Sequence, residues 1–300
     1  MNILKTIKPD LLLETPTQNP QRDQRSSAKE AALPAAVSVD PENNGRVASS
    51  RPLKVILSST KHPSMSRAQF FNHLSNVHAP LVQSIPGINQ YVRKYVQNHT
   101  RLKEDLAPIN TVYPHLETRD SVIELWFDSN EMFLNLMSAP SYAEIVRPDE
   151  ARFNDLSKLI ILAAHEENKY YNISIAATNE PAKIKTFDFV KRKEGISPEE
   201  FLIGLKNYEK ALIASRAYEE NVTAHVWNSA LPTASNPFGT ASDYDGVIET
   251  WFQSYEALET FQQKHSALEH IFGLELEFAD KINSFSVVAE EMPIYDDSQK

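Results

Sequence analysis

The sequence contains no cysteine, no apolar run long enough to cross a bilayer, and no concentration of basic residues. Without cysteine, disulfides, thiolate metal sites and cysteine nucleophiles are all excluded, which suits a reducing compartment, so we expect a cytoplasmic protein. The lack of a long apolar segment predicts no transmembrane helix. A formal net charge of −10 without a basic stripe argues against nucleic acid as a partner.

Residues 1–50 contain no Phe, Tyr or Trp, and they include five prolines. Such a segment has too little apolar surface to offset the entropy lost on ordering, so we expect it to be disordered. Its beginning lacks the continuous apolar region and the small-residue cleavage site of a signal peptide.

The rest of the chain contains one domain twice. The segment VIELWF at 122–127 returns as VIETWF at 247–252, a shift of 125 (247 minus 122), and several downstream positions keep the same spacing. Upstream positions align at a shift of 131, because one connection in the second copy is shorter. We therefore predict a tandem duplication, with a first domain over 51–172 and a second, divergent domain over 173–300.

Each copy shows the order strand, helix, strand, strand, helix, strand. The strands expected in the first copy span 54–59, 91–99, 122–127 and 158–164, with helical segments over 66–84, from 130, and over 148–156. Those of the second copy lie near 184–191, 222–229, 246–252 and 283–290, with a helix that begins at Ser197.

This βαββαβ order is that of a ferredoxin-like unit, an α+β fold in which both helices cover one face of a four-stranded antiparallel sheet. The strands are apolar on both faces, so the open face of each sheet also needs cover. We therefore expect the two units to pack sheet to sheet as an intramolecular α/β barrel of eight strands that encloses a cavity lined by side chains.

Two histidines stand in the first helix, His73 and His78. Residues five apart on an ideal α-helix point about 140° away from each other, so we predict no shared metal site. His78 falls within the apolar arc of the helix, where it is either a buried histidine bonded to the backbone or a catalytic one. His73 lies at the edge of this arc, which favours a solvated position.

The second strand ends in a polar cluster. Tyr95, Gln97 and His99 share one face of this strand, and Asn98 points to the other face. Hydroxyl, amide and imidazole groups at the end of a strand are candidates for binding or polarising an oxygen atom of a substrate.

Glu124 lies between apolar neighbours on a face that also holds Trp126. A carboxylate there either has its pKa raised by burial or is held ionised by a histidine, lysine or arginine. Such perturbed groups occur at functional sites, but structural hydrogen-bond networks produce them too. The second copy keeps the carboxylate as Glu249, which favours the structural interpretation.

The copies differ at the polar positions. The shift of 131 places His73 on Gly204, His78 on Glu209, Asn98 on Ser229 and His99 on Ala230. All three histidines are therefore missing from the second copy, whereas Phe, Leu and Trp positions persist. This pattern indicates one working copy and one copy retained for cover, although drift without consequence in both copies also explains it.

The stretch FFNHLSNVHAPL, followed by PGINQYVRKYVQNH and VIELWF, resembles the EthD family of dimeric α/β-barrel proteins. The resemblance covers about 51–167 and, through the repeat, extends more weakly over 184–291. It implies that the tandem chain is a fused pseudo-dimer with a mostly apolar barrel pocket, and members are linked to ether breakdown and polyketide tailoring. The family's histidine positions match His73 and His78, and its QNH matches 97–99.

Together, the residues and the resemblance predict an enzyme for an aromatic or polyketide-like substrate that uses no metal or organic cofactor. In this hypothesis the chemistry is cyclisation, dehydration or isomerisation, with His78 as general acid or base and Glu124 orienting a histidine. Tyr95, Asn98 or His99 would polarise an oxygen atom. The expected substrate contacts are His73, Tyr95, Gln97 and Trp126.

Two other functions stay open at this point. One is oxidation, in which the same pocket holds an electron-rich substrate against O2. The other is a non-catalytic carrier or accessory protein that binds a small hydrophobic molecule. A homodimer of these pseudo-dimeric chains is also left open, because fold analogy cannot establish function or assembly.

Overall fold

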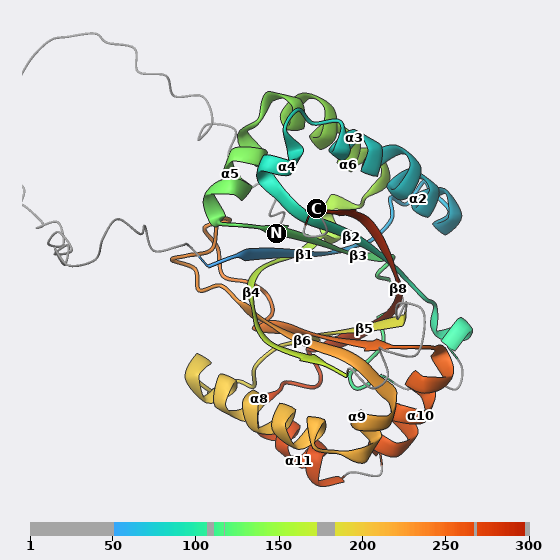
Figure 1. Ribbon diagram of the computed structural model, residues 1–300, viewed down its shortest axis with the longest axis vertical. Helices are drawn as coiled ribbons and strands as arrows, with labels where there is room; N and C mark the ends of the chain where they lie inside the picture. The colour runs from blue at the N-terminus through green and yellow to red at the C-terminus, as the bar shows by residue number, and fades with distance from the viewer. Residues whose placement is uncertain (1–50, 107–110, 117, 173–183, 267–268, 298–300) are drawn as a thin grey trace, which may run out of the picture.

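The computed structural model describes residues 51–300 except for 107–110, 117, 173–183, 267–268 and 298–300. Two units follow each other along the chain, each with the predicted order of strands and helices (Figure 1). The predicted disorder of 1–50 lies outside the described residues. The boundary proposed at residue 172 stays a prediction, because the residues that follow it are not described.

The first unit begins at β1 and ends at β4. Its elements are β1 (Leu53–Ser59), α2 (Arg67–His73), η2 (Leu74–His78), α3 (Ala79–Gln83), α4 (Ile88–Tyr91), β2 (Val92–Thr100), η3 (Lys103–Leu106), β3 (Ser121–Phe127), α5 (Asn130–Ser138), η4 (Tyr142–Val146), α6 (Arg147–Phe153), η5 (Leu156–Lys158) and β4 (Ile160–Tyr171). Of these, η2 and η4 are π-helical, whereas η3 and η5 are 3-10 turns.

The second unit begins at β5 and ends at β8. Its elements are β5 (Ile184–Val190), α8 (Pro198–Ile213), α9 (Arg216–Asn221), β6 (Val222–Ala230), β7 (Gly246–Phe252), α10 (Tyr255–Ser266), α11 (Glu269–Phe278) and β8 (Phe285–Asp296). The first long helix of each unit follows a capping box, at Ser66 and Ser197, in which the serine side chain accepts a backbone N–H of the first turn.

Eight strands from this one chain close into a barrel in the order β1-β3-β2-β8-β5-β7-β6-β4. Within each unit the strands follow the ferredoxin-like order, and the units join edge to edge where β2 pairs with β8 and β4 pairs with β6, both antiparallel. The predicted intramolecular α/β barrel is therefore confirmed.

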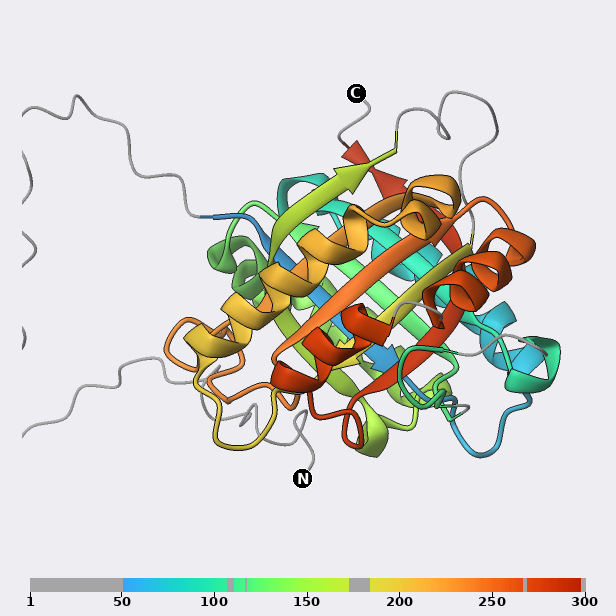
Figure 2. The ribbon, with the colours of Figure 1, turned by 90° about the horizontal axis from the view of Figure 1, so that it is seen from below.

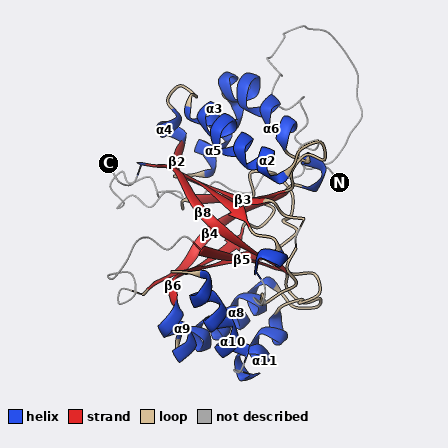
Figure 3. Ribbon diagram, turned by 90° about the vertical axis from the view of Figure 1, so that its right-hand side faces the viewer, coloured by secondary structure: helices blue, strands red, loops and turns tan. Residues whose placement is uncertain are grey.

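The helices lie on two opposite sides of the barrel (Figures 1 and 3). Those of the first unit cover its own strands, and Figure 2 shows α8 (gold) and α11 (red) lying across the strands of the second unit. Separate apolar clusters fill the space between each sheet and its helices. Among the described residues, no helix has both the length and the apolar character that crossing a bilayer requires.

Side chains also fill the barrel interior. Inward-facing residues of both units form a third apolar cluster that includes Ile56, Val122, Phe187 and Phe189. An eight-stranded barrel is just wide enough for its own side chains to fill, so large residues leave little space inside. The alternation predicted for the VIELWF strand is present, with Val122 facing inward.

Three elements differ from the sequence prediction. The last strand of each unit extends well past its predicted end, to Tyr171 and Asp296, because its outer half pairs with a strand of the other unit. That pairing stabilises a polar stretch that shows no apolar alternation. The first helix, predicted to be continuous over 66–84, is interrupted by the π-helical η2.

Candidate functional site

A pocket of about 110 Å³ lies between the sheet of the first unit and the helices that cover it. Outward-facing strand residues, including Val55, Leu57 and Ile123, form part of its lining together with the aromatic rings of Phe133 and Phe153. The expected site in the barrel interior is thus corrected, because large side chains occupy that interior and the pocket lies on the helix side.

Two histidines of the first helix share one carboxylate, Asp149 of α6. His73 Nε2 lies 3.0 Å from Asp149 Oδ1, and His78 Nδ1 lies 3.1 Å from Asp149 Oδ2. In η2 the N–H of Ala79 bonds to the carbonyl of Leu74, five residues back, so positions five apart stack on one face. The prediction that the two histidines point apart is therefore wrong, and the π-helix is the physical reason.

His78 lines the pocket as a neutral imidazole. Burial lowers its pKa, and the hydrogen bond to Asp149 opposes this shift only in part. Since Nδ1–H donates to the carboxylate, Nε2 remains as the basic nitrogen. Asp149 is only 1% exposed, and the Phe153 ring packs against both imidazoles, with centroids 5.0 and 4.8 Å away. A buried carboxylate thus orients the candidate base.

Tyr95 lines the same pocket from β2. Gln97 Nε2 donates to the Tyr95 hydroxyl oxygen at 2.8 Å and to the Leu74 carbonyl at 2.9 Å, and its Oε1 accepts from Ser75 at 2.9 Å. Because the phenolic oxygen accepts this bond, its own O–H remains to donate to a ligand. Burial raises the pKa of Tyr95, so the hydroxyl keeps its proton.

Glu150 follows Asp149 on α6 and also lines the pocket. Burial raises its pKa to about 7, although the Tyr142 hydroxyl donates to it at 2.8 Å and the charge of Arg147 acts in the opposite direction. The carboxyl group therefore holds a proton below neutral pH. A neutral base and a protonated acid are thus present in one apolar pocket.

The second unit contributes Phe238 to the pocket lining. This residue lies in the loop before β7, and its ring meets Phe133 edge-on at 5.2 Å. Asn130 Nδ2 donates to the Ser235 carbonyl at 2.7 Å, which ties the same loop to α5. In the corresponding loop of the first unit, Tyr113 is buried in the apolar cluster of the second unit. Each unit thus covers the other with the loop before its third strand.

His99 is not part of the pocket lining. Its ring stacks on Phe71 with centroids 4.3 Å apart, and its Nε2 lies 3.3 Å from Ser75 Oγ. Burial lowers its pKa to about 4, and the charge of Arg67 acts in the same direction. The structure therefore does not bring His99 together with His78. The Ser75 hydroxyl that contacts His99 donates instead to Gln97 at 2.9 Å.

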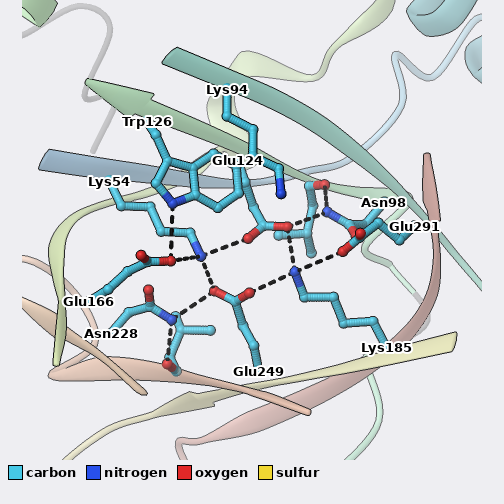
Figure 4. Close-up of polar contacts among 12 residues, drawn as sticks. Lys54, Lys94, Asn98, Glu124, Trp126, Glu166, Lys185, Asn228, Glu249 and Glu291 are labelled. Atoms are coloured by element: carbon cyan, nitrogen blue, oxygen red, sulfur yellow. Dashed lines mark hydrogen bonds and ion pairs between the residues drawn. The ribbon is translucent and has the colours of Figure 1, made fainter. Parts of the chain in front are cut away.

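Three other predicted site residues point into the barrel: Asn98, Glu124 and Trp126 (Figure 4). The two carboxylate oxygens of Glu124 lie 2.8 Å from Lys54 Nζ and 2.6 Å from Lys185 Nζ, and Asn98 Nδ2 donates to Glu124 at 2.8 Å. The prediction that Glu124 orients a histidine is wrong, because its partners are lysines and an asparagine.

We call Lys54, Lys185, Glu124 and Glu249 the barrel cluster. The cluster has approximate two-fold symmetry (Figure 4). Glu249 contacts both lysines, as Glu124 does, and it accepts from Asn228 at 2.7 Å, as Glu124 accepts from Asn98. Burial raises the pKa of Glu249 to about 7 and the nearby Glu124 adds to this. At Glu124 the charges of the two lysines outweigh the effect of burial and hold the pKa below its usual range.

Two further hydrogen bonds lie outside the barrel cluster. The indole N–H of Trp126 donates to Glu166 at 3.0 Å, and that of Trp251 donates to Glu291 at 2.8 Å.

The second unit is nearly closed at the equivalent place, with a cavity of only about 20 Å³. Gly204 stands at the first histidine position, and a Cβ atom there would meet Phe278 at 2.8 Å. Glu209 stands at the second position and pairs with His225 at 3.1 Å. A cavity of this size has room for little more than one water molecule, so the two units are not equivalent as binding sites.

One part of the repeat alignment needs correction. Asn98 pairs with Val122 across its ladder, and Asn228 pairs with Val247 in the same way. The two asparagines are therefore equivalent at a shift of 130, and the alignment of Asn98 with Ser229 is wrong. The asparagine persists because it bonds the buried carboxylate in each unit, whereas the histidine that follows it is replaced.

Four residues of these sites were not predicted from the sequence: Asp149, Glu150, Lys54 and Lys185. Acidic residues in the first turn of α6 fit an ordinary helix start, so nothing set them apart. A signal did exist for the lysines, because the shift of 131 aligns them inside two apolar strands. Glu150 likewise aligns with the buried Glu275 at a shift of 125.

The chain is thus a duplicated α/β barrel with a helix-side pocket in its first unit, and this unit is similar to known proteins. Residues 62–157 match the EthD domain, and this range contains both histidines, Asp149 and Glu150. The predicted resemblance of the first unit to the EthD family is therefore confirmed.

Two named proteins each match a little more than a third of the chain. The conidial pigment biosynthesis dehydratase EthD of Metarhizium robertsii is 27% identical over 110 residues, which cover 35% of this chain and 76% of that protein. The dehydratase aurZ of Gibberella zeae is 26% identical over 116 residues, covering 37% and 74%. A solved anthrone oxidase-like protein shares the fold, with a TM-score of 0.52 and 9% identity over 82% of this chain and 94% of that one.

Proposed function

We propose that the first unit dehydrates an aromatic or polyketide-like substrate by acid–base chemistry, without a metal or organic cofactor. The observation that carries this proposal is the pairing of His78, oriented by Asp149, with a proton-holding Glu150 in one apolar pocket. The two matching relatives are both named dehydratases, which supports dehydration over the other acid–base reactions. A cytoplasmic location and a homodimer of these chains stay predictions.

Dehydration of a β-hydroxy ketone requires a base, an acid and a donor for the carbonyl oxygen. In the proposed reaction His78 Nε2 removes the proton next to the carbonyl group, and Asp149 stabilises the imidazolium that forms. Tyr95 O–H donates to the carbonyl oxygen and stabilises the enolate. Glu150 then gives its proton to the hydroxyl group as the C–O bond breaks, so that water leaves and a carbon–carbon double bond forms.

The catalytic rate is expected to follow a bell-shaped pH profile. On the acid side kcat/KM falls as His78 gains a proton. This fall occurs below pH 6.5, the ordinary pKa of histidine, because burial lowers the pKa of His78. On the alkaline side it falls above about pH 7 as Glu150 loses its proton. The measurement is kcat/KM on a panel of aryl-fused β-hydroxy ketones, whose dehydration extends the conjugated system and changes the ultraviolet absorbance.

Tyr142→Phe provides a matched control for the alkaline limb. The Tyr142 hydroxyl donates to Glu150 and so favours its ionised form. Removing it should move the alkaline limb to higher pH and leave the acid limb in place. If kcat/KM keeps rising above pH 8, or if the alkaline limb stays at the same pH in Tyr142→Phe, Glu150 is excluded as the acid. Binding without turnover across the panel would favour the carrier hypothesis.

A further inference from the structure

We infer that Arg147 forms a carboxylate subsite in this pocket, so that the ligand is an aromatic acid. The inference deepens the proposed function, because it names the substrate class of the same site, but it concerns binding and does not require turnover. Arg147 lines the pocket where η4 meets α6, one turn before Glu150.

The guanidinium group of Arg147 has unused donor capacity. Its Nε is buried and has no hydrogen-bond partner among the described residues. The group lies over the Tyr142 ring, 5.6 Å from its centroid, which fixes its position. A buried donor without an acceptor is costly, so a ligand that supplies acceptor oxygens gains from binding there.

The neighbouring acids leave this positive charge largely uncompensated. Asp149 accepts from both histidines and lies 3.7 Å from Arg152. Glu150 holds a proton below about pH 7, and no ion pair within 4 Å joins it to Arg147 in the described structure. The remaining lining is mostly apolar. A pocket with one cation and neutral neighbours favours an anionic ligand.

The geometry selects a carboxylate attached to an aromatic ring. The Nε and Nη groups of arginine form a planar fork that matches the two oxygens of a carboxylate. Around this fork stand the rings of Phe133, Phe153 and Phe238, which suit a flat apolar body. The pocket volume of about 110 Å³ is near the roughly 150 Å³ of a cavity that holds benzene, so a single ring is the right size for a probe.

Benzoate and its neutral isostere methyl benzoate test this inference by calorimetric titration below pH 7. Benzoate is expected to bind the natural chain about tenfold or more tighter than methyl benzoate, as a charge-assisted bidentate contact allows. Arg147→Met should abolish that preference, and Arg147→Lys should restore part of it, because lysine keeps the charge without the fork. Arg216→Met, at a site 88% exposed, controls for net charge and should keep the full preference.

Equal affinity for the two probes in the natural chain, or a benzoate preference that survives Arg147→Met, would overturn the inference. Melting temperatures show whether each variant is folded. The outcome is independent of catalysis, because His78→Gln should keep the benzoate preference. If neutral ketones are dehydrated while benzoate shows no preference, the carboxylate subsite fails and the proposed dehydration stands.

Discussion

Replacing His78 with glutamine is expected to lower turnover about 10²- to 10⁴-fold, the usual effect of losing a general acid–base group. Glutamine has a similar reach and can still donate to Asp149, but it has no basic nitrogen for the substrate proton. Affinity for methyl benzoate and the melting temperature should change little. The rate is measured on the same panel of hydroxy ketones, with affinity and melting temperature determined for the same preparations.

The matched control is Glu209→Gln at the equivalent position of the second unit. That change removes one partner of the buried Glu209–His225 pair, so it should lower stability and leave turnover unchanged. His99→Ala should also retain activity, because His99 stacks on Phe71 away from the pocket lining. A native rate in His78→Gln would remove it as the base and strengthen the carrier hypothesis.

Lys54→Met is expected to lower the free energy of unfolding by about 3–5 kcal/mol, because it leaves the buried carboxylates Glu124 and Glu249 with Lys185 as their one shared counterion in the barrel cluster. Lys54 is 1% exposed and bonds carboxylates of both units, including Glu124 and Glu249. Lys169→Met is the matched control, since Lys169 pairs with Glu166 at a side chain that is 45% exposed. The control should cost about 0–1 kcal/mol.

Both values come from denaturant unfolding followed by circular dichroism and tryptophan fluorescence. Similar losses in the two variants would mean that water reaches the barrel cluster and that the cluster does not hold the two units together. Noncoincident transitions for the two probes in Lys54→Met would indicate that the units separate before they unfold.

The fold could be predicted because its main signals are local or repeated. The VIELWF duplication revealed two copies, and serine caps at Ser66 and Ser197 marked equivalent helix starts. Edge-to-edge closure was harder to predict in detail, because the polar ends of β4 and β8 become strands only through pairing with the other unit. Tertiary contacts there outweigh the local sequence pattern.

The candidate site was only partly predictable. His78 and Tyr95 were recognised and do line the pocket, with Gln97 behind the tyrosine. The geometry of the histidines depends on the π-helix η2, which no feature of the sequence predicted. The link to Asp149 also joins residues 71 positions apart, which helix periodicity cannot relate.

The barrel cluster, too, could be predicted only in part from the sequence. Alternation along the strand placed Glu124 and Trp126 on one face, and that face does point inward. The choice of partner could not follow, because Lys185 comes from the other unit and meets Glu124 only when the barrel closes. The same closure fills the interior with large side chains, which moves the open pocket to the helix side.

We propose that each chain has one working pocket, between the first sheet and its helices. Titration of isotope-labelled protein with methyl benzoate, followed by nuclear magnetic resonance, tests it most directly. One ligand per chain is expected, with shift changes around His78, Tyr95 and Phe238, and Leu57→Trp should abolish binding by filling the pocket. Two ligands per chain, or binding that survives Leu57→Trp, would contradict it.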